Sequence, residues 1–456
     1  MKKLAPEIFK ADDIRGVVAT QLTPETVELI GKVLGTMTIE AKAKGLTVGY
    51  DGRLSSPELA KYLIKGILST GCNVYEIGQV TTPMVYFANF ELKTLSGVMI
   101  TGSHNPPEYN GLKMVVGGET LSGDKIQQIR QRIEQKNYVS GDGTHYHEDI
   151  TNAYYNKITS DIKLSRKISL IIDAGNGAAG KYAPILYRRL GCKVLGLYCE
   201  VDGNFPNHHP DPSQTKNLKD LVEALKVTDT EVGFAFDGDG DRLGVVTKNG
   251  NIIYPDRQMM LFAADIISKN PKAKIIYDVK SSRLLAEWIK EHGGEPIMCK
   301  TGHSLVKAKI KETGALLAGE MSGHIFFNDR WYGVDDGVYA GARLLEILSM
   351  VDNPSELLNA LPNCISTPEL NIPVAEGEQH KIIEKLLKTA KFAGAKEVIT
   401  IDGLRVEYPD GFGLVRASNT TPVLVLRFEA NTSSALKRIQ DQFRTILNKH
   451  VKNVDF

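Results

Sequence analysis

A pattern of apolar strand, helix, glycine stop and second apolar strand recurs three times along this chain. The copies span residues 47–75, 169–195 and 274–297, and in each copy the first strand ends in an aspartate. A strand, a helix and a second strand in this order form a right-handed parallel βαβ unit. Three widely spaced units therefore predict three similar α/β domains with mixed sheets.

The last part of the chain departs from this repeat. Short strands are expected around 368–373 and 411–428, with helices over 377–390 and 433–448, which predicts a smaller α+β domain. The 456 residues exceed what one hydrophobic core normally serves, and the polar turn at 248–251 is expected to open the third domain. We predict four domains, over residues 1–147, 148–248, 249–362 and 363–456.

Composition and charge exclude several classes of protein. The formal net charge of +1 leaves no basic footprint for nucleic acid. No apolar run approaches the ~18 residues of a membrane span, and the N-terminal segment lacks the apolar stretch of a signal peptide. Five cysteines without a C-x-x-C pair argue against a cysteine-based zinc site and a secreted disulfide framework. We therefore expect a cytoplasmic protein with no nucleic-acid or membrane partner.

One serine stands where a nucleophile is expected. Ser103 follows the apolar stretch 96–100, lies between a glycine and a histidine, and is followed by Pro106 and Pro107. Because proline neither extends a strand nor enters a helix interior, this pattern predicts a rigid turn at the end of a strand. The chain has no Gly-x-Ser-x-Gly elbow, so acyl transfer is not expected. A metal is the expected partner of Ser103.

Three aspartates form the candidate metal site. Asp237, Asp239 and Asp241 alternate with glycines between two apolar runs, and their carboxylates suit a hard cation such as Mg²⁺. An EF-hand calcium loop opens similarly, but it needs glycine at its sixth position and glutamate at its twelfth, where this chain has Arg242 and Lys248. A solvated acidic turn is the remaining alternative. It is disfavoured because three aspartates between buried strands repel one another without a cation.

Two further loops suit a phosphorylated ligand. Arg416 offers a guanidinium fork, and the serine, asparagine and threonine that follow offer further donors to a phosphate dianion. The loop 319–324 displays a glutamate, a serine and a histidine between glycines, an array that suits sugar hydroxyls. A Ser-Asn-Thr run is also ordinary turn chemistry, so neither loop identifies a site by itself.

Taken together, the four runs resemble those of the phosphohexomutase family, in its bacterial phosphomannomutase/phosphoglucomutase branch. The resemblance covers the chain from 9–16 to the Arg416 loop, with the motifs in the family's order. It implies that the four domains are arranged around a central active-site cleft. It implies reversible phosphoryl transfer between the 1- and 6-positions of mannose and glucose phosphates, through a phosphoserine enzyme and a hexose 1,6-bisphosphate. The products would be sugar 1-phosphates for nucleotide-sugar and polysaccharide synthesis. It also implies Mg²⁺ as cofactor, hexose 1,6-bisphosphate as activator, and a monomer that binds the 1- and 6-phosphates of mannose and glucose.

The resemblance also implies roles for individual residues. The metal would be held by Ser103, Asp237, Asp239 and Asp241. The catalytic set would be Ser103, His104, Lys113, Arg242, His303 and His324. The substrate-binding set would be Arg15, Lys280, His303, Glu320, Met321, Ser322, Gly323, His324, Arg416, Ala417, Ser418, Asn419 and Thr420. Relatives usually carry tyrosine where this chain has Asp12, so the substrate contact of that tyrosine is not carried over.

Alternative functions make distinct predictions. A metal-dependent sugar phosphatase would share the aspartate loop but release free phosphate, and a narrower phosphomannomutase or phosphoglucosamine-type mutase would prefer one sugar. A catalytically inactive sugar-phosphate sensor would keep Arg416 without an intact serine and aspartates. The glycine pattern at 175–180 matches the G-x-G-x-x-G of dehydrogenases. Such a pattern also arises wherever a helix packs closely on a strand.

Overall fold

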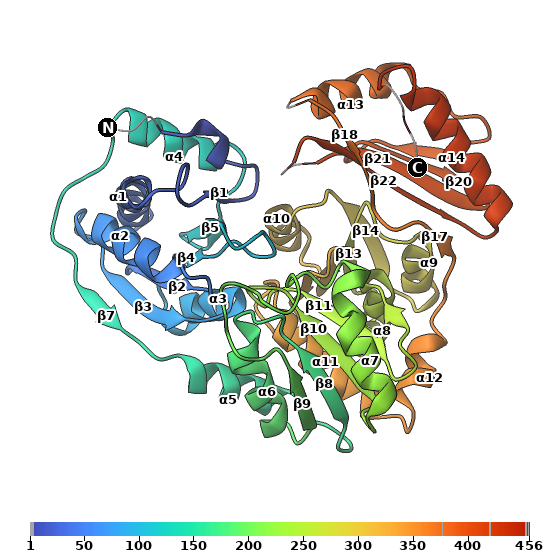
Figure 1. Cartoon of the computed structure of the whole chain (residues 1–456), viewed down its shortest axis with the longest axis horizontal. Helices are drawn as coiled ribbons and strands as arrows, with labels where there is room; N and C mark the ends of the chain where they lie inside the picture. Colours follow the sequence, from blue (N-terminus) through green and yellow to red (C-terminus); the bar gives the residue numbers. More distant parts are fainter. Residues whose placement is uncertain (1–3, 376, 419–420, 452–453, 455) are drawn as a thin grey trace.

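Each of the three predicted strand–helix–strand repeats lies in a sheet of its own, and a fourth sheet lies near the C-terminus (Figure 1). The computed structural model describes residues 4–375, 377–418, 421–451, 454 and 456. In every repeat the two strands are parallel neighbours, which confirms the βαβ prediction. The pairs are β2 (Leu46–Tyr50) with β3 (Val74–Gln79), β8 (Ser169–Asp173) with β9 (Lys193–Leu197), and β13 (Lys274–Asp278) with β14 (Glu295–Cys299).

The first sheet has the order β1-β5-β4-β2-β3-β7, with β6 paired to β5. Its other strands are β1 (Ile14–Val17), β4 (Gly97–Ile100), β5 (Tyr109–Val116), β6 (Glu119–Thr120) and β7 (His145–His147). Both β1 and β4 are antiparallel to β5, so the sheet is mixed. Three helices share one apolar core with this sheet, namely α1 (Pro24–Glu40), α2 (Ser56–Leu68) and α4 (Asp124–Glu134). Helix α1 begins where Thr23 accepts a hydrogen bond from the Thr26 amide and proline occupies the first turn.

The second sheet has the order β12-β11-β10-β8-β9, and the polar turn that was expected to open the third domain lies within it. The polar turn at 248–251 joins β11 (Leu243–Thr247) to β12 (Ile252–Ile253) as an antiparallel hairpin, and the Thr247 amide donates to the Asn251 carbonyl at 2.9 Å. The turn therefore belongs to the second sheet, because polar composition marks hairpin turns and linkers alike. The remaining elements are β10 (Val232–Phe236), α5 (Thr151–Asp161), α6 (Ala179–Arg189) and α7 (Lys219–Val227).

The third sheet, β14-β13-β15-β16, is fastened to the first two domains by apolar packing. One continuous core runs from α3 (Thr82–Glu91) of the first domain through the second and third domains. Shared apolar burial of this extent favours the three domains moving as one body. The other elements of the third domain are β15 (Leu317–Gly319), β16 (Ile325–Phe327), α8 (Pro255–Lys269), α9 (Arg283–Glu291), α10 (His303–Thr313), α11 (Gly337–Leu348) and α12 (Pro354–Asn359).

The fourth domain is an antiparallel sheet, β17-β22-β21-β20-β19 with β18 on β22, that has a core of its own. The two predicted helices are present as α13 (Glu378–Thr389) and α14 (Ser433–Leu447). Its contacts with the third domain are hydrogen bonds and ion pairs around one small apolar cluster, that of Val279 with Phe412 and Leu414. Arg405 Nη1, for example, donates to the Val279 and Ser281 carbonyls at 2.7 and 2.6 Å. A polar interface of this kind permits domain motion. The strands are β17 (Ile365–Ser366), β18 (Leu370–Pro373), β19 (Glu397–Ile399), β20 (Leu404–Tyr408), β21 (Gly411–Ala417) and β22 (Val423–Ala430).

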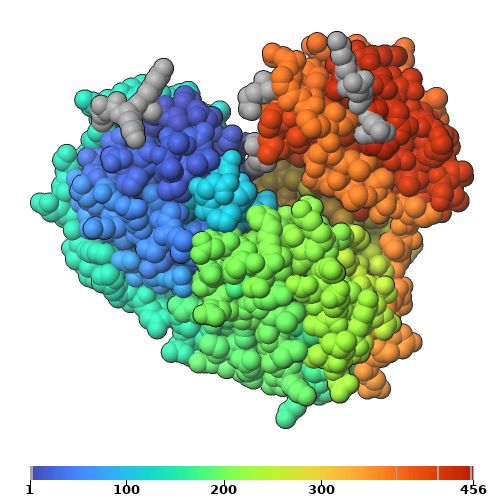
Figure 2. All heavy atoms as spheres, viewed as in Figure 1, coloured from blue at the N-terminus to red at the C-terminus, as the bar shows by residue number. Residues whose placement is uncertain are grey.

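A hollow separates the first domain, blue, from the fourth domain, orange to red, in Figure 2. A cavity of about 510 Å³ is lined by residues from all four domains. This arrangement matches the predicted central cleft. Within the described part of the chain, no helix has the length and apolar character needed to cross a membrane.

Candidate active site

Ser103 lies on a buried turn between β4 and β5, with a backbone conformation that residues other than glycine seldom adopt. Its φ is 50° and its relative exposure is 1%. The Ser103 amide donates to Thr101 Oγ1 at 2.7 Å. Its hydroxyl oxygen lies 3.2 Å from His104 Nδ1 and 3.3 Å from Asp237 Oδ2. A left-handed conformation here costs roughly 1–3 kcal/mol, so the surrounding contacts must hold the turn in place.

A buried arginine that was not predicted from the sequence, Arg53, holds this turn. The Arg53 guanidinium donates to four backbone carbonyls of the turn at 2.6–3.0 Å, those of Ser103, Asn105, Pro106 and Tyr109. Arg53 Nε also lies 3.3 Å from Asp51 Oδ2. The sequence does contain one indication of this role, because Asp51 and Arg53 form a charged pair directly after a buried strand. Burying an ion pair is costly unless its hydrogen bonds are satisfied, so such a pair is expected to have specific partners.

The side chains of Asp237, Asp239 and Asp241 converge on one point between β10 and β11. One carboxylate oxygen of each lies within 4.8 Å of the others, and all three residues are fully buried. Oδ1 of Asp239 and Oδ1 of Asp241 have no hydrogen-bond partner among the described residues. Burial, and then the charges of Asp241 and Asp239, raise the pKa of Asp237 well above its ordinary value. Buried carboxylate oxygens without partners fit a divalent cation, and the Ser103 hydroxyl lies beside them.

Lys113 of β5 brings a positive charge to the same cluster. Its Nζ lies 2.7 Å from Asp239 Oδ2 and 2.5 Å from Asp241 Oδ2. Burial alone would lower the pKa of Lys113, but the two carboxylates raise it above its ordinary value, so the amine stays protonated. Gly238 lets the aspartate loop approach the serine turn, because a Cβ there would lie 2.3 Å from the Ser103 carbonyl oxygen.

Two histidines of the third domain share one carboxylate at the cleft wall. The Nδ1 atoms of His303 and His324 lie 4.0 and 3.0 Å from Asp335 Oδ2. Arg242 Nε donates to His324 Nε2 at 3.0 Å, so His324 is held between an arginine and a carboxylate. Burial, and then the Lys307 charge, lower the pKa of His303 well below its ordinary value, so its imidazole is neutral. Asp335 was not predicted from the sequence.

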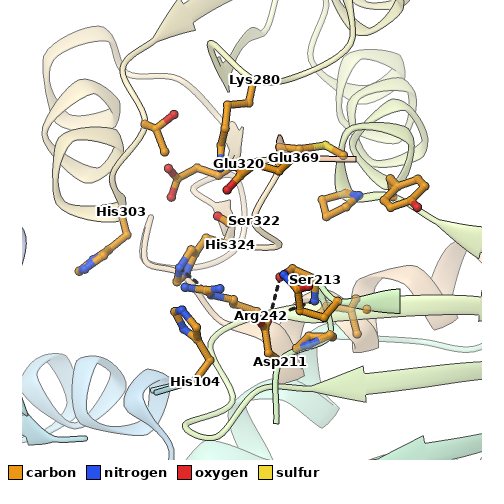
Figure 3. Close-up of a pocket in the computed structure, with 18 of the residues that line it drawn as sticks. His104, Asp211, Ser213, Arg242, Lys280, His303, Glu320, Ser322, His324 and Glu369 are labelled. Carbon is orange, nitrogen blue, oxygen red and sulfur yellow. Dashed lines mark hydrogen bonds and ion pairs between the residues drawn. The ribbon is translucent and has the colours of Figure 1, made fainter. Parts of the chain in front are cut away.

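His104 faces this group from the first domain. In Figure 3 its ring lies below Arg242 and points toward His324. Burial, and then the charges of Arg242 and Arg15, lower the pKa of His104 well below its ordinary value. A neutral imidazole therefore lies beside the Ser103 hydroxyl.

The loop between β15 and β16 presents a free acceptor to the cavity. Glu320 Oε1 accepts from the Gly302 amide at 2.7 Å, whereas the buried Oε2 has no partner among the described residues. Burial raises the pKa of Glu320 to about 7, against the opposing effect of His324. Figure 3 shows Glu320, Ser322 and His324 around the same space. A buried acceptor without a partner suits the hydroxyl donors of a ligand.

A cationic pair lies at the end of the cavity formed by the fourth domain. Arg416 Nε donates to Asp402 Oδ2 at 2.9 Å, and its buried Nη2 has no partner within the described ranges. Lys280 lines the same cavity and lies 2.9 Å from Glu369 Oε2. Asp402 and Glu369 were not identified from the sequence, because neither belongs to a recognisable motif. The guanidinium has donors left for an anion.

The residues predicted for the site differ in their position relative to the cavity. Those that line it are Arg15, Ser103, His104, Lys113, Arg242, Lys280, His303, Glu320, Met321, Ser322, His324, Arg416 and Ser418. Asp237, Asp239 and Asp241 are buried and do not line it, nor do Gly323 and Ala417. The predicted Asn419 and Thr420 lie outside the described residues. Asp12 lines the cavity and accepts a hydrogen bond from the Ser304 hydroxyl, which links the first domain to the third.

The glycine pattern at 175–180 serves close packing. A Cβ at Gly177 would lie 2.9 Å from the Cα of Gly238, and a Cβ at Gly180 would lie 2.2 Å from the Cys199 carbonyl oxygen. The Ala178 amide donates to the Gly238 carbonyl at 3.0 Å. The aspartate loop thus covers the backbone that would have to receive a dinucleotide pyrophosphate, which disfavours the dehydrogenase alternative.

Four family models match consecutive parts of the chain. Three are described as phosphoglucomutase/phosphomannomutase alpha/beta/alpha domains: domain I matches residues 6–140, domain II residues 145–250 and domain III residues 254–364. The fourth, described as the phosphoglucomutase/phosphomannomutase C-terminal domain, matches residues 369–446.

Relatives match along nearly the whole chain. A phosphoglucomutase of Neisseria gonorrhoeae is 58% identical over 453 residues, which cover 99% of this chain and 98% of the relative. A phosphomannomutase/phosphoglucomutase of Pseudomonas aeruginosa is 55% identical over 445 residues, which cover 97% of this chain and 96% of the relative. The crystal structure of a phosphoglucomutase/phosphomannomutase family protein from Burkholderia thailandensis is 53% identical and covers 99% of each chain, with a TM-score of 0.95.

Proposed function

This chain belongs to the phosphoglucomutase/phosphomannomutase family of isomerases, which move a phosphoryl group between the 1- and 6-positions of hexose phosphates, and we propose the residues through which it does so. The proposal rests on one observation: Ser103 lines the cavity and lies directly beside three buried aspartates. The same cavity holds Arg416 and Glu320, each with a polar atom left without a partner among the described residues. These groups suit a phosphorylated sugar.

In the proposed cycle Ser103 begins phosphorylated. The bond between its oxygen and phosphorus breaks as a bond forms from phosphorus to the free hydroxyl of the bound hexose phosphate, giving a hexose 1,6-bisphosphate. The bisphosphate then reverses its orientation within the cleft, so that its other phosphoryl group faces Ser103 and is transferred to the serine oxygen. The net product is the positional isomer. Hexose 1,6-bisphosphate acts as an activator because it can phosphorylate an unmodified Ser103.

The side chains around Ser103 have different roles in the phosphoryl transfer. Asp237, Asp239 and Asp241, with Ser103, would hold Mg²⁺, which when bound supplies charge neutralisation for the transferring group. Lys113 and Arg242 stabilise negative charge on the equatorial oxygens. His303, as a neutral imidazole, takes up the hydroxyl proton. His324 is already engaged by Arg242 and serves to orient the sugar.

Substrate turnover tests the proposed function. Glucose and mannose differ only in configuration at carbon 2, whereas a site anchored at the phosphates and at Glu320 has little leverage on that carbon. The kcat/KM values for glucose 1-phosphate and mannose 1-phosphate should therefore agree within about tenfold, a gap of no more than ~1.4 kcal/mol. N-acetylglucosamine 1-phosphate should be a poor substrate, and Glu320→Ala should impair both hexose reactions alike.

A coupled mutase assay with the three sugar phosphates measures these values. A thousandfold preference for one hexose would favour a narrower mutase, and efficient turnover of the N-acetyl sugar would favour a phosphoglucosamine-type enzyme. Release of free phosphate from glucose 1-phosphate at the rate of turnover would favour the phosphatase. The cytoplasmic location and the monomeric state stay predictions.

Replacing Arg416 by alanine should chiefly weaken substrate binding, because this side chain is assigned to the phosphate that is not reacting. Loss of a hydrogen bond to a charged group costs about 1.5–3 kcal/mol, which corresponds to an increase in KM of roughly 10- to 150-fold. Steady-state kinetics with glucose 1-phosphate would measure it. Arg438→Ala is the matched control, since that arginine lies exposed on α14 of the same domain and pairs with Asp410. An unchanged KM in Arg416→Ala would place this residue outside the site.

The pKa of about 7 for Glu320 predicts a pH-dependent KM. The carboxyl group is mostly protonated at about pH 6 and mostly ionised at about pH 8, and only the ionised form accepts from two hydroxyls. KM for glucose 1-phosphate should therefore fall by up to about tenfold across this interval. Glu320→Gln should keep only the part of the profile that arises from the substrate phosphate. Superimposable KM profiles for the two proteins would contradict the assignment.

The same residue should affect stability in a defined direction. The pKa of Glu320 is raised from 4.5 to about 7 in the folded protein, so its protonated form favours folding. That contribution is complete below the unfolded pKa and is lost as the pH rises through the folded pKa. Glu320→Gln should consequently gain thermal stability relative to the parent at about pH 8 and show the smallest difference near pH 4.5.

A further inference from the structure

Two histidines and a glutamate cluster at the outer edge of the first sheet, away from the cleft. Glu76 lies on β3, and His145 and His147 lie on β7. His145 Nε2 is 2.8 Å from Glu76 Oε2, and His147 Nδ1 is 3.4 Å from the same oxygen. The two imidazole centroids are 4.4 Å apart. One ligand atom from each residue lies within 4.8 Å of the others, and none of the three residues lines the cavity of the active site.

The strand register brings the three side chains together. In the parallel pairing of β3 with β7, His147 lies opposite Glu76 and His145 lies opposite Val74. Side chains two positions apart on a strand project from the same face, so both imidazoles point to the side on which Glu76 lies. The backbone pairing therefore places all three side chains next to one another on one face of the sheet edge.

We propose that Glu76, His145 and His147 form a second metal site, which binds Zn²⁺. Two imidazoles and one carboxylate are a recognised zinc ligand set, with bonds of about 2.0–2.2 Å that place tetrahedral ligand atoms about 3.3–3.6 Å apart. The 3.4 Å separation of His147 Nδ1 from Glu76 Oε2 already matches, the 2.8 Å separation of His145 Nε2 calls for an outward movement of that imidazole, and the ligand atoms of the two histidines lie within 4.8 Å. The His147 side chain is 76% exposed, which leaves the fourth position open to water.

Ligand chemistry separates this site from the aspartate loop. Imidazole favours zinc and its neighbours in the transition series, whereas a set of carboxylates favours Mg²⁺. The two sites should therefore be distinguishable with two metals in one solution. Mg²⁺ in large excess occupies the aspartate loop and leaves the histidine pair available to Zn²⁺.

The position of β7 gives the site a structural consequence. This strand of three exposed residues lies on the segment that runs from the first domain to α5 of the second (Figure 1). It is held to β3 by backbone pairing, by the stacking of Tyr75 on Tyr146 at 5.0 Å, and by the Glu148 amide donating to the Glu76 carbonyl at 2.9 Å. Bound Zn²⁺ would join side chains of both strands and so fasten the interdomain segment to the first sheet.

Calorimetric titration of the full chain with Zn²⁺, in a large excess of Mg²⁺, tests the proposal. The parent protein should bind one more equivalent of Zn²⁺ than His145→Ala/His147→Ala, and Glu76→Gln should bind this equivalent at least about tenfold more weakly. His380→Ala is the matched control, because His380 is exposed on α13 outside the cluster, and it should bind as the parent does. Equal stoichiometry and affinity in the parent and the double variant would overturn the site.

Two further readouts keep the result interpretable. The double variant should retain full mutase activity in Mg²⁺, which shows that its loss of Zn²⁺ binding is not a loss of fold. Zn²⁺ should raise the melting temperature of the parent and leave that of the double variant unchanged. Equal Zn²⁺-induced shifts in both proteins would contradict the fastening role. Zn²⁺-dependent dimers in light scattering would show that the ion bridges two copies, and would overturn a site within one chain.

Discussion

Replacing Ser103 by alanine should lower kcat for the conversion of glucose 1-phosphate to glucose 6-phosphate by about 10⁴-fold or more, the scale of loss when a covalent nucleophile is removed. Alanine supplies no oxygen to carry the phosphoryl group. The neighbouring His104 contacts the serine hydroxyl through Nδ1 and is not expected to act as the phosphoryl acceptor in its place. A coupled assay that reports glucose 6-phosphate would measure the rate. Binding of the substrate, measured by calorimetry, should change little.

Ser160→Ala provides the control for this experiment. That serine is exposed at the end of α5, so its loss should leave both rate and binding unaffected. Mutase activity above a trace in Ser103→Ala, in protein free of parent enzyme, would exclude the covalent role assigned to Ser103.

Replacing Asp239 by asparagine should weaken Mg²⁺ binding and lower kcat by about 100- to 1,000-fold, the range for removing one group that stabilises transition-state charge. The substitution removes one anionic oxygen from the three-carboxylate set and one partner of the Lys113 ammonium. Part of the lost rate should return at high Mg²⁺ concentration, which kinetics at increasing Mg²⁺ would reveal. EDTA should abolish the mutase activity of the parent protein, and added Mg²⁺ should restore that activity.

The matched control is Asp229→Asn, an exposed aspartate of the same domain. It should show the parent's rate and the parent's dependence on Mg²⁺. Full activity of the parent in chelator would rule out the metal role of the aspartate loop, and a parent-like Asp239→Asn would exclude this residue as a ligand.

The sequence allowed the repeated part of the fold to be predicted because strand and helix periodicity are local properties. The strands β2, β8 and β13 and the helices that follow them lie where the apolar pattern placed them. Short edge strands carry too little pattern: β19 has three residues, all exposed or half-buried, and it was not predicted. The polar turn at 248–251 was expected to open the third domain but joins two strands of the second sheet, because a hairpin turn and a linker have the same polar composition.

Residues of the candidate site could be proposed from the sequence where several polar side chains lie in one run. The serine turn, the aspartate loop and the 319–324 loop each carry several polar residues between apolar strands. Arg53, Asp335 and Glu369 are single charged residues outside such runs, and only tertiary packing brings them to the turn, the histidines and Lys280. Those contacts cannot be predicted from the spacing of residues along the chain.

The proposed cycle depends on a phosphoryl group that Ser103 carries and passes to the sugar. Protein incubated with glucose 1,6-bisphosphate and Mg²⁺, then digested and measured by mass spectrometry, should carry one phosphoryl group on the peptide that contains Ser103. Brief exposure to excess glucose 1-phosphate should exchange a radiolabel from that serine into the sugar at a rate no slower than kcat. An active enzyme whose Ser103 stays unmodified, or whose label does not pass to the sugar, would exclude Ser103 as the phosphoryl carrier.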